Sequence, residues 1–264
     1  MKKLISFIGL AAVVLLGFTS CDKEPKPKFT TNLNTGHQYV GSLYGRKGIV
    51  EDPEDAQGIV FAVSPDEKTA YLVAFTDLME VNTVPTTGFN WGYDCFATPT
   101  AWSNNIFETG AKDKDGEKNT ERIIAADTMK GGTAAQNCRE YFKRNYQATV
   151  ENQETFDEYL KWEDTKGDWY LPSMEELAAL MKVRDKINQK YLQGAPASDV
   201  ANKIYFQAIG GEMNFAYWSS TEHNRQLAWY DLPASNNDNA VPKTWANEKG
   251  NGKIYVRPIR KVAL

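Results

Sequence analysis

Runs of apolar residues along the chain predict a set of short strands. Residues 58–64 and 69–75 are two apolar runs separated by a polar turn, and together they predict a β-hairpin. Residues 215–220 and 227–230 form a second pair of short apolar runs, which predicts two neighbouring strands. The stretch from 254 to 262 alternates apolar and polar residues, which is typical of a half-buried strand near the C-terminus.

Capping signals predict where helices begin. Thr133 followed by Gln136, and Ser173 followed by Glu176, both have the spacing of a capping box. In such a box two side chains satisfy the exposed backbone N–H groups at the start of a helix. A third capping box at residues 155–158 predicts a further short helix.

The stretch at residues 168–177 organises the predicted fold. Its first half reads as a short buried strand that a proline ends. Its second half begins a helix whose apolar residues recur at helical spacing. We expect Trp169 and Leu171 to alternate with Tyr170 and to build a buried corner together with Trp218. The stretch is therefore predicted to be scaffold and not a ligand site.

These elements predict one folded unit of the α+β class, with two helices packed on small, mostly antiparallel sheets and joined by long loops. With 264 residues, of which 42% are hydrophobic and 12% aromatic, the chain can bury a substantial core. We find no internal repeat of fixed period and no domain boundary after Gly36. Residues 37–264 are therefore predicted to form a single domain.

The first twenty residues (1–20) are predicted to be a lipoprotein signal peptide. Lys2 and Lys3 precede an apolar run that ends at small residues and Cys21, a pattern that resembles a bacterial lipobox. Cleavage there would leave Cys21 as the lipid-bearing first residue; the alternative is a plain secretory signal with a chance cysteine. Residues 21–36 combine Lys-Pro repeats with Thr and Asn and have little to bury, so they predict a flexible tether.

The charge of the chain argues against a nucleic-acid-binding protein. Its formal net charge is -4 and its pI is about 5.4, whereas nucleic-acid binding needs a basic surface. The lipobox predicts a protein of the cell envelope that is lipid-anchored in the outer membrane, with its head either at the cell surface or facing the periplasm. It would contact the membrane through the lipid anchor only.

The three cysteines leave room for one disulfide if Cys21 carries lipid. Cys95 and Cys138 then remain, and they could pair in an oxidising compartment. The alternative is that both are buried free thiols, since unpaired cysteine behaves as a small hydrophobic residue.

No arrangement of residues predicts catalysis, a metal site or a bound cofactor. The two histidines, His37 and His223, are far apart in sequence, and no cysteine–histidine cluster has zinc spacing. The sequence also lacks a Gly-x-Ser-x-Gly elbow and a Walker-type glycine loop. Residues 113–117 resemble part of a calcium loop but lack its full ligand series, so we expect a solvated turn. We therefore predict a binding protein and not an enzyme.

Four segments, taken in order, carry a resemblance to a known family. They are residues 58–61 (Gly-Ile-Val-Phe), 168–173 (Asp-Trp-Tyr-Leu-Pro-Ser) with Glu176 and Leu177, 217–222 (Tyr-Trp-Ser-Ser-Thr-Glu) and 256–260 (Val-Arg-Pro-Ile-Arg). Together they resemble the C-terminal domain family of bacterial collagen-like adhesins, a branch of the C-type-lectin-like fold. That family often has cysteines near the positions of Cys95 and Cys138. The resemblance implies a lectin-like scaffold that displays a ligand-binding surface.

The chain is also similar to variable proteins that retroelements diversify. Their variable positions lie between the Trp-Ser-Ser segment and the closing Val-Arg-Pro segment. In this chain that window is residues 223–251, and it is rich in asparagine; the alternative is an ordinary polar loop. The same fold hosts formylglycine-generating enzymes, but these use a cysteine pair near the C-terminus, and no cysteine follows Cys138 here.

The predicted ligand-binding face lies within this window. Aromatic residues supply contact area, and Asn and Asp supply adaptable hydrogen bonds, which is the composition of a paratope. The candidate residues are His223, Asn224, Arg225, Trp229, Tyr230, Asp231, Asn236, Asn237 and Trp245. Trp229 and Tyr230 alternate along a strand, so we expect only one of them to be exposed. Trp245 stands alone in a polar segment, where it either contacts ligand or tucks under its own loop.

Two functions remain open from the sequence. The first is a ligand-binding or adhesion protein of the cell envelope whose partner is an unknown protein or glycan. The second is a structural subunit of an adhesive surface assembly, in which the same face contacts another subunit. Composition and spacing do not distinguish these two functions or identify a ligand.

Overall fold

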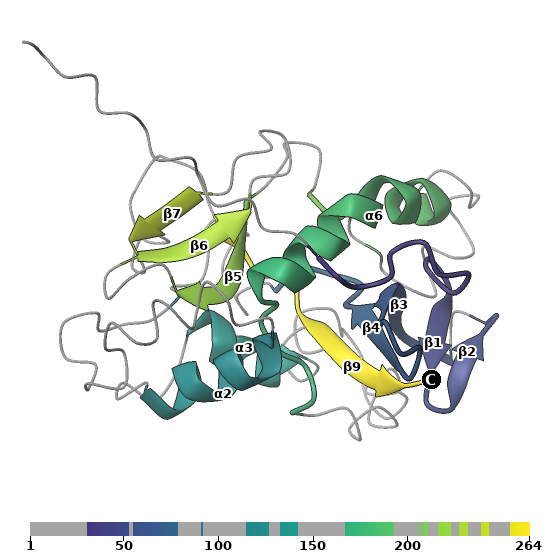
Figure 1. Cartoon of the computed structure of the whole chain (residues 1–264), viewed down its shortest axis with the longest axis horizontal. Helices are drawn as coiled ribbons and strands as arrows, with labels where there is room; N and C mark the ends of the chain where they lie inside the picture. The colour runs from purple at the N-terminus through teal and green to yellow at the C-terminus, as the bar shows by residue number, and fades with distance from the viewer. Residues whose placement is uncertain are drawn as a thin grey trace, which may run out of the picture.

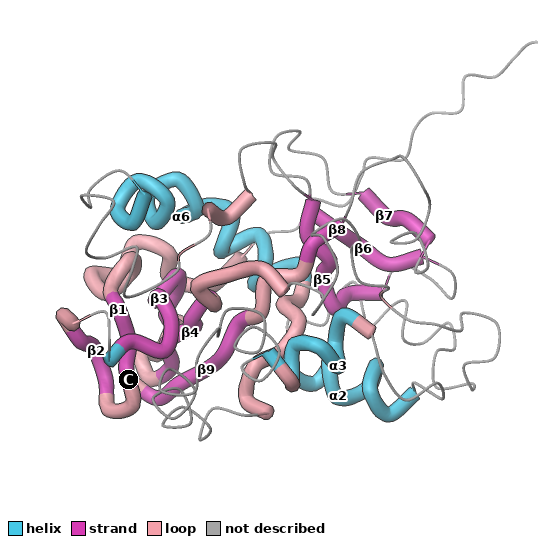
Figure 2. The backbone as a smooth tube through the Cα atoms, turned by 180° about the vertical axis from the view of Figure 1, so that it is seen from behind, coloured by secondary structure: helices cyan, strands magenta, loops and turns pink. Residues whose placement is uncertain are grey.

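A mixed α+β architecture is present in the part of the chain that the structure describes. In this computed structural model, that part comprises residues 31–52, 55–78, 91, 115–126, 133–141, 167–192, 206, 208–210, 216–222, 227–231, 239–242 and 254–264. It contains three helices and two β-sheets (Figures 1 and 2). The prediction of the α+β class is confirmed at this level.

The larger sheet has five antiparallel strands (Figure 1). They are β1 Leu43–Gly45, β2 Gly48–Val50, β3 Ala56–Val63, β4 Thr69–Val73 and β9 Ile259–Ala263, in the spatial order β2-β1-β3-β4-β9. The central strand β3 is buried along its whole length. The predicted hairpin is confirmed as β3 and β4, with Ile59 opposite Val73.

The smaller sheet has four strands and contains a parallel pair. In spatial order the strands are β7 Asn239–Pro242, β6 Leu227–Asp231, β5 Ala216–Glu222 and β8 Ile254–Tyr255. β5 and β8 run parallel, while the other neighbours are antiparallel. The prediction of mostly antiparallel sheets is therefore confirmed, and the β5–β8 pair is the exception among the described strands. The alternative of an ordinary polar loop for residues 223–251 does not hold for the parts of that window that form β6 and β7.

The C-terminal stretch forms two strands in different sheets instead of the single strand that its alternation predicts. β8 belongs to the smaller sheet and β9 to the larger one, and Val256, Arg257 and Pro258 connect them. Pro258 has no backbone N–H and so cannot continue a strand ladder. The side chain of Arg257 is completely buried. A connection of only three residues therefore joins the two sheets at this point.

Three helices are present among the described residues, and the capping signals predict two of them. The three are α2 Gly116–Ala126, α3 Ala134–Arg139 and α6 Met174–Leu192. α2 begins inside the segment 113–117, which we expected to be a solvated turn. The buried side of α2 combines the polar residues Asn119 and Thr120 with Ile123, so its first turns lack the apolar periodicity that identifies a helix in sequence. The short helix predicted from residue 155 lies outside the described residues.

The Ser173–Glu176 capping box is confirmed in both directions, and the predicted Thr133–Gln136 box is confirmed for the bond that Thr133 accepts. The side-chain oxygen of Thr133 accepts a hydrogen bond from the backbone N–H of Gln136 at 3.2 Å, at the start of α3. At the start of α6, the Oγ of Ser173 accepts from the N–H of Glu176 at 3.3 Å. In return, Glu176 Oε2 accepts from the N–H of Ser173 at 2.8 Å. Each box satisfies donors that the first helical turn leaves unpaired.

Helix α6 covers parts of both sheets with one apolar face. It contacts β3 of the larger sheet and β5 and β6 of the smaller sheet. Its buried apolar residues are Met174, Leu177, Ala179, Leu180, Val183 and Ile187. The helix is therefore amphipathic, and its other side faces solvent. Neither α6 nor any other helix in the described ranges is long and apolar enough to cross a membrane.

The stretch at 168–177 lies between two buried cores. The first core surrounds β3 and α6 and contains Tyr170, while the second surrounds α3 and β5 and contains Trp169 and Leu171. Trp169 is 2% exposed, and Tyr170 and Leu171 are completely buried. Trp218 belongs to the second core. The predicted corner of Trp169, Leu171 and Trp218 is therefore confirmed.

Hydrogen bonds fasten the same stretch to both sheets. Tyr170 and Ile259 of β9 form an isolated antiparallel bridge, with N···O distances of 2.9 and 3.0 Å. On the other side, the N–H of Ser220 in β5 donates to the carbonyl of Pro172 at 2.7 Å. The N–H of Met174 donates to a β5 hydroxyl, Thr221 Oγ1, at 2.9 Å. The stretch is thus a structural link between the sheets.

The described chain begins inside the predicted tether and is already attached to the fold there. Asn34 pairs with Val63 at the end of β3 through two backbone hydrogen bonds of 2.8 and 3.1 Å. The N–H of Asn32 donates to Glu175 Oε1 at 2.8 Å. The folded part therefore starts before His37. The predicted signal peptide and the first part of the tether lie outside the described residues.

Replacing Trp169 by alanine should destabilise the fold strongly. The side chain is buried in the second core, where its ring centroid lies 5.0 Å from that of Tyr141. Truncation leaves a large cavity, so we expect the free energy of unfolding in urea to fall by about 3–5 kcal/mol. The control is Lys182→Ala at an exposed position of α6, which should change it by less than about 0.5 kcal/mol. Wild-type stability of Trp169→Ala would contradict the buried position of this motif.

Candidate functional site

The predicted ligand-binding residues of β6 are buried. Trp229 is 6% exposed, and Tyr230 and Asp231 are each 9% exposed. The expectation that one of the two aromatic side chains is exposed is therefore wrong. They belong to different cores, Trp229 to the first and Tyr230 to the second, so both sides of β6 are covered. Tyr230 also packs edge-on against Trp218, with ring centroids 6.4 Å apart.

The other predicted contact residues lie outside the part of the chain that the structure describes. They are His223, Asn224, Arg225, Asn236, Asn237 and Trp245. All six belong to connections between strands of the smaller sheet. The structure therefore describes the scaffold that carries these connections, and the role of the six residues in binding stays a prediction.

Cys138 is a free thiol in this structure, so the predicted disulfide with Cys95 is not formed. Cys138 lies on the buried face of α3, in the second core. Burial raises the pKa of its thiol well above the usual value, which keeps the group neutral and unreactive. For Cys138 the alternative of a buried free thiol is the one observed. Cys95 and Cys21 lie outside the described residues.

Buried polar side chains gather in two centres. One is built on Glu176 and the other on the ion pair between Arg257 and Asp77. Neither is a metal site: within the described ranges, no group of three or more His, Cys, Asp or Glu side chains could hold a metal ion. The geometry of each centre decides whether its side chains serve the fold or could meet a ligand.

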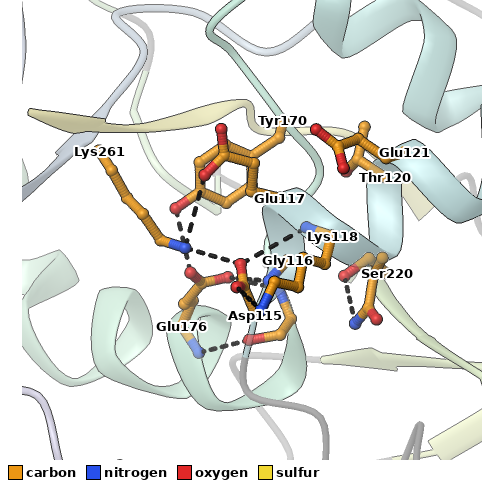
Figure 3. A network of polar contacts seen from close by, with 12 residues as sticks. Asp115, Gly116, Glu117, Lys118, Thr120, Glu121, Tyr170, Glu176, Ser220 and Lys261 are labelled. Carbon is orange, nitrogen blue, oxygen red and sulfur yellow. Dashed lines mark hydrogen bonds and ion pairs between the residues drawn. The ribbon is translucent and has the colours of Figure 1, made fainter.

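Glu176 places a carboxyl group where the starts of two helices meet (Figure 3). Its side chain is 1% exposed. Oε2 accepts from the backbone N–H of Ser173 at 2.8 Å and from that of Gly116, the first residue of α2, at 3.1 Å. Oε1 accepts from the hydroxyl of Tyr170 at 3.0 Å. One carboxyl group therefore satisfies donors at the N-terminal ends of α6 and α2, where negative charge is favourable.

Gly116 is required by the close approach of these two helix ends. A β-carbon at this position would lie 2.4 Å from Glu176 Oε2 and 2.6 Å from both the carbonyl oxygen of Leu171 and the nitrogen of Ser173. Thr120, one turn along α2, extends the contact, because its Oγ1 accepts from the N–H of Leu171 at 3.0 Å. The start of α2 is thus held directly against the link between the two sheets.

Lys261 of β9 covers the outer side of the Glu176 centre (Figure 3). Its Nζ lies 2.7 Å from Asp115 Oδ1, 3.7 Å from Glu117 Oε2 and 5.3 Å from the ring centroid of Tyr170. Burial acts to lower the pKa of Lys261, but the hydrogen bond to Asp115 and the charge of Glu176 outweigh it and raise that pKa. The amine is therefore held in its charged form.

The Glu176 carboxyl group itself is difficult to ionise. Burial raises its pKa to about 7, because the ionised form loses its hydration inside the protein. The charge of Lys261 and the hydrogen bonds of Ser173 and Tyr170 act in the opposite direction. Both oxygens are engaged by donors of the fold, and the group has almost no contact with solvent. The geometry therefore supports a structural role, in which Glu176 joins the two helix starts.

The second polar centre fixes the crossing of the chain between the sheets. Arg257 Nη1 and Asp77 Oδ1 are 3.0 Å apart, and the two side chains are 0% and 1% exposed. Arg257 also donates to the carbonyls of Ala74 at 3.0 Å and Phe75 at 3.1 Å, while the hydroxyl of Tyr217 donates to Asp77 Oδ2 at 3.1 Å. Burial raises the pKa of Asp77, and Arg257 opposes this. Hydrogen bonds and opposite charge together compensate for burying the pair.

Local sequence patterns reveal only one part of these centres. The capping-box spacing identifies Ser173 and Glu176 as partners. Gly116 is 60 residues from Glu176, and Asp77 is 180 residues from Arg257. No spacing rule connects residues so far apart, so these partners are not visible in the sequence.

Replacing Glu176 by glutamine should remove a pH dependence of stability. The folded pKa of about 7 lies above the ordinary value of 4.5, so between these pH values the unfolded chain loses a proton that the folded chain keeps. The free energy of unfolding of the wild-type chain should therefore fall by about 3 kcal/mol as the pH rises from about 4.5 to about 7. Below this pH window Glu176 is protonated in both states, so its contribution no longer changes with pH. Urea denaturation at pH values across the window should show that Glu176→Gln lacks this fall in stability.

The control for this measurement is Glu175→Gln, one position earlier on the same helix. Glu175 accepts from Asn32 and leaves the hydrogen bonds of Glu176 untouched, so the control should keep the wild-type pH dependence. A stability difference between wild type and Glu176→Gln that stays constant across the window would contradict the raised pKa of this carboxyl group.

Comparison with known proteins finds a distant similarity to a solved structure. No family model matches the chain, and no curated protein matches it. The chain is similar to the crystal structure of a fimbrial protein from Bacteroides ovatus ATCC 8483, with a TM-score of 0.42 and 18% sequence identity. The similarity covers 84% of this chain and 48% of that chain, so it spans about half the length of the fimbrial protein.

Proposed function

We propose that this chain is a cell-envelope protein that is anchored in the outer membrane by lipid on Cys21 and binds a protein or glycan ligand, or mediates adhesion. The proposed binding face is formed by the connections between strands of the smaller sheet. The proposed head has the C-type-lectin-like fold that the sequence resembles. The proposal assigns no catalytic step and no cofactor to the chain.

One observation carries this proposal: the head divides into a fixed scaffold and the polar connections that it carries. All seven residues of β5 are buried, and the stretch at 168–177 is hydrogen-bonded both to β5 and to β9. The asparagine-rich window 223–251 begins directly after β5 and ends just before β8. Binding proteins commonly place contact residues on loops that a rigid scaffold positions.

The positions of the family-like segments support the proposed lectin-like head. The Trp-Tyr-Leu-Pro-Ser segment leads from a buried extended stretch into α6. The Trp-Ser-Ser segment is part of β5, which lies between β6 and β8 in its sheet. The Val-Arg-Pro segment connects the two sheets. Each segment thus has a scaffold position, and the proposed binding residues lie outside all of them.

A structural subunit of an adhesive surface assembly is the second candidate. Among the described strands, β2 is at the edge of the larger sheet, and its Ile49 is 40% exposed. An edge strand presents backbone groups that can pair with another chain, and an exposed apolar side chain favours such contact. Strong self-association in light scattering without any external ligand would favour this candidate over the first.

Replacing Trp245 by alanine should change binding while leaving the fold intact. The residue belongs to the proposed face, so we expect binding to weaken at least about tenfold and the urea midpoint to stay at its wild-type value. The ligand is first identified with glycan arrays and with pull-downs from envelope extracts. The matched control is Trp218→Ala, which removes a tryptophan of the second core and should unfold the head. Wild-type binding by a folded Trp245→Ala chain would contradict this assignment of the face.

Exposure at the cell surface is a separate part of the proposal and needs its own observation. Antibody or protease access to the head is measured on intact cells and again after the outer membrane is opened. A head that only becomes accessible after opening would contradict a role in adhesion and leave ligand binding within the envelope.

A further inference from the structure

Helix α6 carries a row of lysines on its solvent side. Lys182, Lys186 and Lys190 are spaced four residues apart, so they lie along one face of the helix. All three are exposed. The buried apolar residues of α6 point the other way, toward the two sheets. The row is thus a surface feature, although Lys190 also donates to the carbonyl of Gly41.

Acidic side chains of the same helix do not balance this row. Glu175 and Glu176 are buried, and both accept backbone hydrogen bonds inside the fold. Asp185 is exposed and forms an ion pair with its neighbour Arg184 at 3.0 Å. The solvent side of α6 is therefore basic, although the chain as a whole has a net charge of -4.

The first described segment, residues 31–42, extends along α6 and adds no acidic side chain. At one end the N–H of Asn32 donates to Glu175 Oε1 at 2.8 Å, and at the other end Lys190 Nζ donates to the carbonyl of Gly41 at 2.6 Å. The segment contains neither Asp nor Glu. Together, α6 and this segment form one face. Its only exposed acidic residue is Asp185, which is paired with Arg184.

This segment is also the one that the predicted anchor enters. Nine residues lie between Cys21 and Thr31, and the ten residue steps from one to the other span at most about 33–36 Å. The membrane that holds a lipid on Cys21 would therefore lie within this distance of the N-terminal end of α6. In both views of the molecule, α6 lies on one side, and α2 and α3 lie on the opposite side (Figures 1 and 2).

We propose that the lysine face of α6 turns toward the membrane in which Cys21 is anchored and binds the anionic headgroups of its phospholipids. The proposal rests on the lipid anchor of the proposed function. Each lysine close to an anionic membrane strengthens partitioning about fivefold, so the row of three contributes about a hundredfold at low salt. The attraction is electrostatic and acts over about 10 Å at moderate salt. It would fix which side of the head faces the membrane.

Amine labelling of the lipidated full-length mature protein in vesicles tests this orientation. Protein in phosphatidylcholine vesicles is compared with protein in vesicles that also contain phosphatidylglycerol, and the labelling of each lysine is read by mass spectrometry. We expect labelling of Lys182 and Lys186 to fall about fivefold in the anionic vesicles and to recover at high salt. Lys118 on α2, whose side chain is 68% exposed, is the internal control and should label equally in both.

A pair of variants repeats this test with Lys190 as the labelled residue, so that the lysines that are replaced are not the ones that are measured. We also expect Lys190 of the wild-type chain to label less in anionic vesicles than in phosphatidylcholine vesicles. In a chain that carries Lys182→Gln and Lys186→Gln, labelling of Lys190 should become equal in the two kinds of vesicle. In the control chain, with Lys47→Gln and Lys118→Gln at exposed positions off this face, Lys190 should still label less in anionic vesicles.

Two failures of this experiment have different meanings. Equal labelling of Lys182 and Lys118 in both kinds of vesicle, on a chain whose mass shows lipid at Cys21, would overturn the membrane-facing surface and leave the proposed function intact. A chain from its native envelope without lipid at Cys21 would overturn the anchor itself, and the orientation with it.

Discussion

The carboxyl group of Glu176 is the contact on which the described architecture depends. It accepts hydrogen bonds from the first residue of α2, from the cap of α6 and from the hydroxyl of Tyr170. Buried helix ends need partners for their N–H groups, and here a single side chain satisfies donors of two helices. Tyr170 also pairs with β9, so its contact with Glu176 connects both helices to the larger sheet. Pro172 and Met174 form the hydrogen bonds that connect the same stretch to β5.

This arrangement separates what holds the molecule together from what it presents. The stretch at 168–177 and β5 are buried and hydrogen-bonded on several sides, and the ion pair of Arg257 with Asp77 fixes the chain where it crosses from the smaller to the larger sheet. None of these residues is positioned to meet a ligand. The proposed binding role therefore falls to the connections of the smaller sheet, and the proposed membrane contact to the solvent side of α6.

Local rules predicted the elements whose formation depends on local sequence. The β3–β4 hairpin follows from two apolar runs around a turn, and the starts of α3 and α6 follow from capping boxes. α2 escaped prediction because its buried side mixes the polar residues Asn119 and Thr120 with Ile123, and its glycine start is set by Glu176, far away in sequence. The alternation of Trp229 and Tyr230 correctly indicates a strand, but the strand has a core on each side, and periodicity cannot reveal how many sides are covered.

Hydrogen exchange at the backbone amides of Gly116 and Ser173 tests the joint role of Glu176 most directly. We predict that both amides are strongly protected in the wild-type chain, and that Glu176→Ala speeds the exchange of both together by at least about tenfold. Glu175→Ala, which removes the neighbouring carboxylate, should leave both rates near wild type. If Glu176→Ala exposes Ser173 but leaves Gly116 protected, α2 is held by other contacts, and Glu176 does not join the two helix starts.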